Sequence, residues 1–140
     1  MELGAAIKAG FTKTFVYQGR ASRSEFWFFQ LFHVIVFVVL MMVLAVVLNL
    51  SANREGTISP VAGLSMLLVV IYLIGMLLPL ISLAVRRLHD SDKSGAFLLL
   101  TFVPFGGLVL LVFYCLPGSI GPNKYGDDPL HPATAAARVF

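Results

Sequence analysis

Apolar residues follow one another along this chain in three long runs, and short charged segments separate the runs. The windows without any Asp, Glu, Lys or Arg are 28, 30 and 30 residues long and cover residues 26–53, 56–85 and 94–123. A helix that crosses the hydrocarbon core of a bilayer, about 30 Å thick, needs roughly 20 apolar residues. We therefore predict three transmembrane helices, near residues 26–50, 62–85 and 96–116.

The segment before the first run has a different pattern, in which apolar side chains recur at every fourth position. These are Leu3, Ile7, Phe11 and Phe15, and the basic residue Lys8 lies on another side of the same helical wheel. This spacing is typical of an amphipathic helix. Basic helices of this kind lie in the membrane interface, so we predict an interfacial helix over residues 1–17. The alternative is a helix that packs against the rest of the protein.

Composition indicates a membrane protein and excludes an ordinary soluble domain. Hydrophobic residues make up 59% and charged residues 12% of the 140 residues, whereas soluble domains average about 45–50% apolar and about 25% charged. The length suits one domain, which we place at residues 1–132, followed by a short mobile tail at 133–140. The predicted fold class is thus an all-α membrane protein with three transmembrane helices after an amphipathic interfacial helix.

The third apolar run contains Pro104, Gly106 and Gly107, which interrupt a helix. We predict a kinked span here, because backbone at half-depth must be sheltered by protein; the alternative is a re-entrant hairpin. With three spans, the Lys and Arg residues divide seven to three between the two sides, which predicts a cytoplasmic N-terminus and an external tail. A hairpin would place the tail inside and change the division to nine to one.

Charged residues gather directly before the first run and after the second. Arginines at the C-terminal end of a helix meet the negative pole of its dipole, and they are costly inside the bilayer, so they end the span. Both charged segments face the cytoplasm in the predicted topology. We therefore expect a mixed-charge cluster at the membrane surface that binds lipid or a protein partner. Its predicted members are Arg20, Arg23, Glu25, Arg86, Arg87, His89, Asp90, Asp92 and Lys93.

Local spacing predicts several contacts within these segments. Ser22 and Glu25 match the capping box of a helix N-terminus. Asp90 follows Arg86 by four residues, which allows the two side chains to pair along one helix. Ser91, Asp92 and Ser94 are candidate caps for the third helix.

Three polar residues, Gln30, His33 and Asn49, lie within the first predicted span. Gln30 and His33 share a helix face because they are three residues apart. Polar side chains at this depth usually face the bundle and bond to another helix. A proton-relay role for His33 is the alternative.

Four sequence segments together resemble a known family. They are GRASRSEFWFFQLF, RRLHDSDKSGAFLLL, VPFGG and GPNKYGDDP. In this order they are similar to the family called domain of unknown function 805, over about residues 10 to 130. Ala96 and Phe97 depart from it, because members often have Trp after this SG, and the departure concerns interface anchoring only. The resemblance implies a protein of the bacterial inner (plasma) membrane and implies no activity.

Three functions are compatible with these residues. The first, which we favour, is a binding or organising protein whose cytoplasmic cluster holds an anionic lipid headgroup or an acidic partner. The second is an oligomeric transporter or channel component, since three spans of one copy enclose little space. The third is a lipid-modifying enzyme that uses His89, Asp90 and Asp92.

The sequence favours a protein without catalytic activity. The three candidate ligands His89, Asp90 and Asp92 crowd into four residues, which is poor metal geometry, so we expect no metal and no cofactor. The expected partners are membrane lipids and, in a homo-oligomer, further copies of this chain. Nucleic acid is not an expected partner, because topology explains the net charge of +3.

Overall fold

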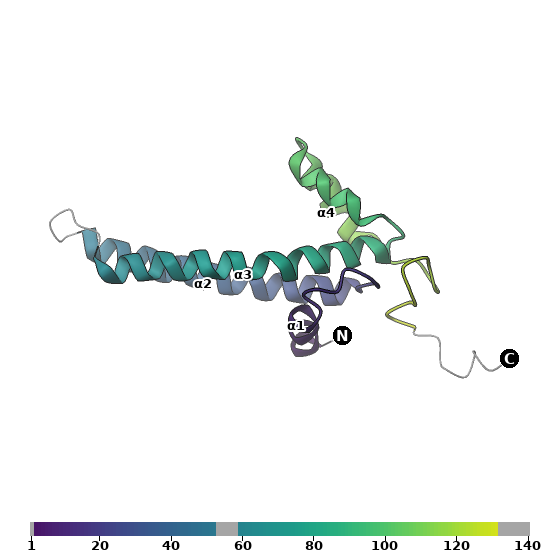
Figure 1. The fold of residues 1–140 in the computed structure, drawn as a ribbon, viewed down its shortest axis with the longest axis horizontal. Coiled ribbons are helices and arrows are strands. Elements are labelled where there is room, and N and C mark those ends of the chain that lie inside the picture. The colour runs from purple at the N-terminus through teal and green to yellow at the C-terminus, as the bar shows by residue number, and fades with distance from the viewer. Residues whose placement is uncertain (1, 53–58, 132–140) are drawn as a thin grey trace.

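The computed structural model describes residues 2–52 and 59–131, and the elements in this part of the chain are helices. The segment between α2 and α3 at residues 53–58 and the predicted tail at 133–140 lie outside the described residues. The helices are α1 (Leu3–Thr12), α2 (Arg23–Ala52), α3 (Pro60–Asp90), the 3₁₀ helix η1 (Gly95–Phe102) and α4 (Gly106–Cys115). The long helices α2 and α3 lie side by side over most of their length (Figure 1).

The first two predicted spans correspond to α2 and α3. These helices have 30 and 31 residues, so each is about 45 Å long, which exceeds a hydrocarbon core of about 30 Å. Both are long and apolar enough to cross a membrane. Large apolar side chains along them point outward, as for Met42 and Ile74, which are 63% and 67% exposed. A bilayer stabilises this arrangement, whereas water would not.

Side-chain caps define where these helices begin. The Ser22 hydroxyl accepts a hydrogen bond from the Glu25 N–H at 3.2 Å, and α2 starts at Arg23, directly after Ser22. Ser59 caps α3 in the same way, with Pro60 in the first turn, and Ser94 caps η1. The caps predicted at Ser22 and Ser94 are therefore confirmed. The other half of the predicted capping box does not form, because the Glu25 carboxylate instead binds Arg86.

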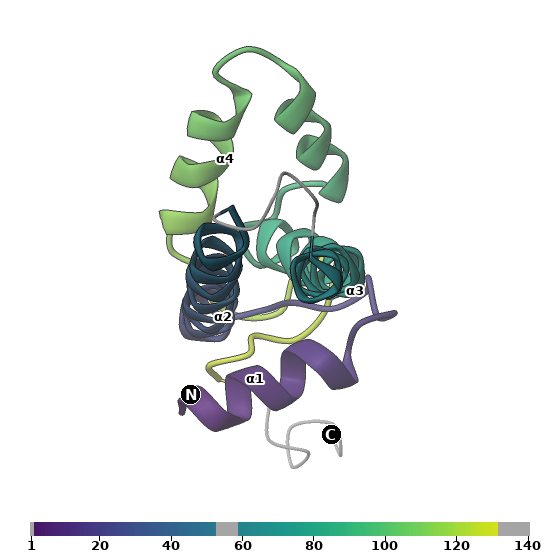
Figure 2. The ribbon, with the colours of Figure 1, turned by 90° about the vertical axis from the view of Figure 1, so that its left-hand side faces the viewer.

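The prediction of one helix over residues 96–116 is wrong, because η1 and α4 fold back on each other as a hairpin (Figure 2). The rings of Phe97 and Phe113, one on each leg, have centroids 5.6 Å apart. At the tip, Phe105 adopts a left-handed conformation with φ of 62°. A Cβ atom on Gly106 would lie 1.9 Å from the Leu100 carbonyl oxygen, so only glycine permits this close approach. The proline and glycines thus turn the chain rather than kink a helix.

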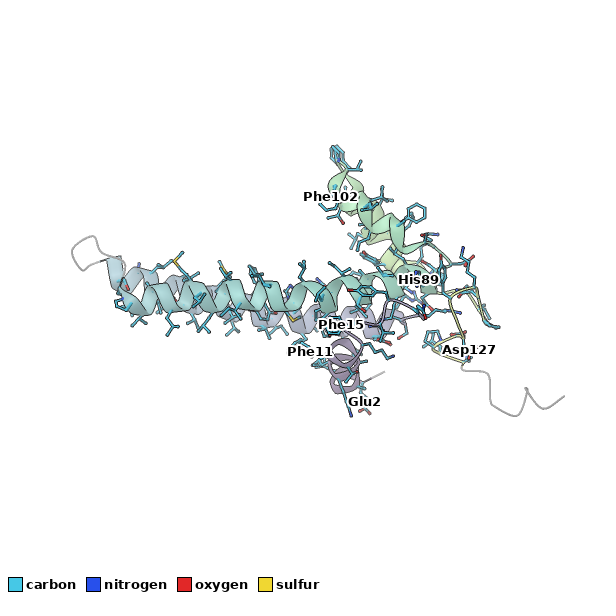
Figure 3. All side chains as sticks on the ribbon, viewed as in Figure 1. Glu2, Phe11, Phe15, His89, Phe102 and Asp127 are labelled. Carbon is cyan, nitrogen blue, oxygen red and sulfur yellow. The ribbon has the colours of Figure 1, made fainter. Side chains whose placement is uncertain are left out.

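The legs of this hairpin are too short to cross a bilayer. η1 has 8 residues and α4 has 10, so each leg is about 15 Å long, half of a core of about 30 Å. The hairpin starts and ends near the C-terminus of α3, and Phe102 at its tip is 85% exposed (Figure 3). The geometry is that of the re-entrant alternative.

Helix α1 lies across the pair formed by α2 and α3 (Figure 2). Its small residues permit close packing, since a Cβ on Gly10 would lie 2.1 Å from the Phe29 ring. Phe11 meets Phe29 edge to face at 5.4 Å, whereas Phe15 beyond the helix is 75% exposed (Figure 3). The predicted range of 1–17 is too long, because the helix ends at Thr12. One side of α1 therefore packs on α2 while other apolar side chains stay exposed.

Candidate functional site

The start of α2 and the end of α3 meet in a buried group of charged side chains, which we name the arginine cluster. Every member is at most 7% exposed, so these residues do not lie on the surface as the sequence analysis expected. Burial of charge is tolerated only where the charges are paired and hydrogen-bonded. The cluster consists of Arg20, Glu25, Arg86, Arg87 and Asp90.

Two carboxylates pair with the three arginines. Arg86 Nη1 donates to Glu25 Oε1 at 2.7 Å. Arg20 Nε donates to Asp90 Oδ1 at 3.0 Å, and Arg87 Nη1 donates to Asp90 Oδ2. The predicted pairing of Asp90 with Arg86 is wrong, because Arg20 and Arg87 occupy both Asp90 oxygens. Arg86 Nε and Nη2 are buried without a hydrogen-bond partner among the described residues, so this guanidinium depends on Glu25.

The end of the hairpin returns to this cluster through Arg87. Its Nε donates to the carbonyl oxygen of Tyr114 at 3.1 Å, and its Nη2 donates to that of Leu116. Arg87 lies in the last turn of α3 and binds carbonyl groups at the end of α4, so the two helices end close together. The residues after α4 therefore lie at the end of the molecule where α2 begins (Figure 1).

The segment after α4 closes over the cluster. Arg20 donates to the carbonyl oxygens of Ser119 at 2.5 Å and Gly121 at 2.6 Å. The Ser119 N–H donates to the Asp90 carbonyl oxygen at 2.8 Å. A Cβ on Gly118 would lie 2.3 Å from Asp90 Oδ2, so a side chain does not fit there. Three distant stretches of sequence are thus joined around one buried carboxylate.

His89 also joins segments together (Figure 3). Its ring stacks on Tyr125 with centroids 3.8 Å apart, and its Nδ1 lies 3.2 Å from the Gly19 carbonyl oxygen. Its own carbonyl accepts a hydrogen bond from the Asn123 side chain at 2.9 Å. Both the ring and the backbone carbonyl of His89 therefore make contacts that hold these segments together.

The other predicted cluster members are more exposed. Asp92 has a left-handed φ of 56° and approaches Lys124 at 3.8 Å on the surface. Lys93 Nζ lies 4.9 Å from the centroid of the Phe113 ring. Arg23 is exposed in the first turn of α2. Of the predicted basic residues, Arg23 and Lys93 are thus the ones not enclosed by ion pairs.

A cavity of about 350 Å³, here named the polar cavity, lies beside the first turn of α2. Asp128 in its wall accepts hydrogen bonds that hold its pKa below the usual range, the largest cause being the Leu130 N–H and the next the His131 ring. The wall contains one arginine, Arg23, and a second carboxylate, Asp90, which Arg20 and Arg87 compensate. Other residues in its wall are Ser22, Ser24, Gly118 and Ser119.

A second cavity of about 490 Å³, here named the apolar cavity, lies between the hairpin and the long helices. α2 contributes Trp27 and Gln30 to its wall, and α4 contributes Leu111 and Tyr114. This cavity could not be predicted from the sequence, because its walls depend on the hairpin.

The three intramembrane polar residues do not line one path. His33 Nδ1 lies 2.8 Å from the Tyr72 hydroxyl of α3, which donates to the His33 carbonyl oxygen at 3.0 Å. Gln30 lines the apolar cavity. Asn49 is exposed and lies about 24 Å beyond His33 along α2. His33 thus holds two helices together.

Residues 2–52 and 59–131 contain no group of three or more His, Cys, Asp or Glu side chains that could hold a metal ion.

The residues that cover the cluster were not predicted from the sequence. They belong to the end of the chain, which a third span would have placed on the other side of the membrane, and they are Ser119, Asn123, Tyr125 and Asp128. The available signal was the segment GPNKYGDDP, which carried part of the family resemblance.

Comparison with known proteins places these features in a family. Residues 14–127 match the family described as protein of unknown function DUF805. The chain is 46% identical over 114 residues to inner membrane protein YhaI of Escherichia coli strain K12, covering 81% of this chain and 85% of the relative. It is 37% identical over 114 residues to inner membrane protein YhaH of the same strain, covering 81% and 86%. No solved structure matches. The matched region contains the whole arginine cluster. YhaI and YhaH are named inner membrane proteins. The chain therefore belongs to the DUF805 family.

Proposed function

We propose that this protein is a multi-pass protein of the bacterial inner membrane that binds and organises anionic phospholipid at its cytoplasmic end. The observation that carries the proposal is the polar cavity beside the exposed Arg23, at the end of the molecule where the cationic residues gather. A recess at the membrane surface that has an exposed arginine in its wall recognises a phosphate-bearing headgroup through charge and hydrogen bonds.

The proposed topology has α2 and α3 crossing the membrane and the hairpin entering from the cytoplasmic side. Cytoplasmic segments of membrane proteins are rich in Lys and Arg, and eight of the ten Lys and Arg residues lie at one end of the described structure. In this orientation α1 lies flat in the interface with Phe15 toward lipid. The eight residues are Lys8, Lys13, Arg20, Arg23, Arg86, Arg87, Lys93 and Lys124.

A reporter fused after Phe140 tests this topology. We expect a fluorescent protein at this position to be bright and alkaline phosphatase to be inactive, because residues 117–131 share the cytoplasmic end with the start of α2. Phosphatase inserted after residue 55, between α2 and α3, is the matched control and should be active. Phosphatase activity after Phe140 would support a third full span and contradict the re-entrant arrangement.

Headgroup binding is assigned to the first turn of α2. Helix N-termini present free N–H groups and the positive pole of the dipole, which favour anions. Arg23 adds a full charge there, and the hydroxyls of Ser22 and Ser24, which are hydrogen-bonded to each other at 3.1 Å, add polar groups to the wall. Of the carboxylates in the wall, Asp90 is compensated by two arginines, whereas Asp128 accepts three hydrogen bonds and stays ionised.

Replacing Arg23 by glutamine tests the proposal. Because one basic residue near anionic lipid contributes about 1 kcal/mol, we expect about fivefold weaker binding of phosphatidylglycerol. Native mass spectrometry of the protein in mild detergent, titrated with phosphatidylglycerol or phosphatidylcholine, measures this. Lys8→Gln, an exposed change on α1 at the same end of the molecule, is the matched control and should leave binding within twofold. Equal binding of both lipids by the unchanged protein would contradict the proposal.

A further inference from the structure

We infer that the polar cavity and the apolar cavity form one continuous site for a whole phospholipid, with the anionic headgroup in the first and one acyl chain in the second. The inference rests on the proposed function and extends it, since it states that the protein binds a lipid molecule by both ends. Its consequence is selection of a lipid from the bilayer instead of attraction to a charged membrane surface.

The wall that α2 contributes runs from one cavity into the other. Arg23, Trp27 and Gln30 follow one another at spacings of four and three residues, so they form one stripe on the helix. Arg23 lines the polar cavity, and Trp27 and Gln30 line the apolar cavity. The stripe covers about 10 Å along the helix axis. A single molecule of lipid length therefore follows it from the charged end into the membrane.

The other two walls continue in the same direction. On the side of the hairpin, Tyr114 lines the apolar cavity and Pro117, three residues later, lines the polar cavity. On α3, Ala84 lines the apolar cavity and Asp90 lines the polar cavity. Between these two residues on α3 lies Arg87, which is fully buried and binds the carbonyl oxygens of Tyr114 and Leu116. All three walls thus continue from the apolar cavity to the polar cavity in the same direction.

The chemistry of the two cavities matches the two ends of a phospholipid. The apolar cavity, about 490 Å³, is within the size range of ligand sites, roughly 300–1,000 Å³. Trp27 and Tyr114 in its wall carry amphipathic rings, which prefer the level of the headgroups. The remaining wall is mostly aliphatic and aromatic, and includes Phe26, Leu80, Ile81, Leu98 and Leu111.

The position of the apolar cavity selects a lipid over a water-soluble ligand. Its outer wall is the hairpin, whose legs reach about half of the bilayer depth from the charged end of the molecule. A ligand that fills both cavities must therefore be charged at the cytoplasmic surface and apolar at mid-depth. An anionic phospholipid meets both conditions, whereas inorganic phosphate fills only the polar cavity.

Replacing Gly107 by phenylalanine fills the apolar cavity with minimal disturbance. Gly107 lines this cavity, and a Cβ atom built on it meets nothing within 4 Å. Phenylalanine also has a higher helix propensity than glycine. Native mass spectrometry is expected to show at least tenfold less bound phosphatidylglycerol. Gly75→Phe is the matched control, since Gly75 on α3 is equally unobstructed and lines neither cavity; it should bind like the unchanged protein.

A second comparison uses the unchanged protein and needs no variant to fold. Phosphatidylglycerol is titrated against its water-soluble deacylated headgroup, glycerophosphoglycerol, in the same detergent. Because each buried methylene favours binding, the deacylated compound should bind at least tenfold more weakly. Equal binding of the two compounds, or unchanged lipid binding by a folded Gly107→Phe protein, would overturn the inference while the headgroup proposal stands. If the unchanged protein bound phosphatidylglycerol and phosphatidylcholine equally, both the inference and the headgroup proposal would be overturned.

Discussion

Replacing Arg86 by alanine is expected to lower the free energy of unfolding by about 3–5 kcal/mol, because it leaves a buried carboxylate without its counter-charge. The Arg86 and Glu25 side chains are 1% and 3% exposed, and they meet at 2.7 Å. Water cannot solvate the Glu25 carboxylate at that position once the guanidinium is gone. Chemical denaturation of the detergent-solubilised protein, followed by circular dichroism, measures the loss.

Two variants separate this effect from a general loss of positive charge. Arg23→Ala removes an exposed arginine from the same end of α2 and should change the unfolding free energy by less than about 0.5 kcal/mol. The double variant Arg86→Met with Glu25→Leu removes both charges and should recover most of the lost stability, as replacement of a whole buried pair often does. An Arg86→Ala protein as stable as the Arg23→Ala protein would show that the pair is not buried.

The long helices and their caps could be predicted because local information determines them. Length and apolar composition alone separate a spanning helix from a soluble one, and the hydroxyl of Ser22 reaches an N–H only three residues away. The fold of residues 96–116 could not be predicted in this way, since a span and a hairpin have the same composition. The close approach of Gly106 to the Leu100 carbonyl decides between them, and this contact is a property of the folded backbone.

The charged members of the arginine cluster were predictable from the sequence, but their pairings and the residues that cover them were not. Segment position indicated that Arg20 and Arg86 would face the same side of the membrane. The spacing of four residues then suggested Arg86 with Asp90, yet the carboxylate of Glu25 on α2 takes Arg86 instead. Tertiary contacts override helix spacing here, because the exchange gives both Asp90 oxygens an arginine partner.

The second large effect on stability is expected from a change at Asp90, which connects the end of α3 to Arg20 before α2 and to Ser119 after α4. Asp90→Asn removes the charge that compensates Arg20 and Arg87, so two buried guanidinium groups lose their partner. We expect a loss of about 3 kcal/mol or more in unfolding free energy. We also expect residues 117–131 to detach, because Arg20 holds the carbonyl oxygens of Ser119 and Gly121 while it is itself held by Asp90.

Limited trypsin digestion measures this detachment at Lys124, an exposed residue within the segment. Cleavage should be at least tenfold faster in Asp90→Asn, because proteolysis follows the population of locally opened chain. Circular dichroism should still report the helices α2 and α3, which also contact each other along the remainder of their length. Asp92→Asn is the matched control, since it makes the same chemical change at an exposed position whose left-handed φ asparagine tolerates. Equal cleavage rates in the two variants would mean that Asp90 does not hold the segment, and the polar cavity would then lose the wall formed by residues 117–120.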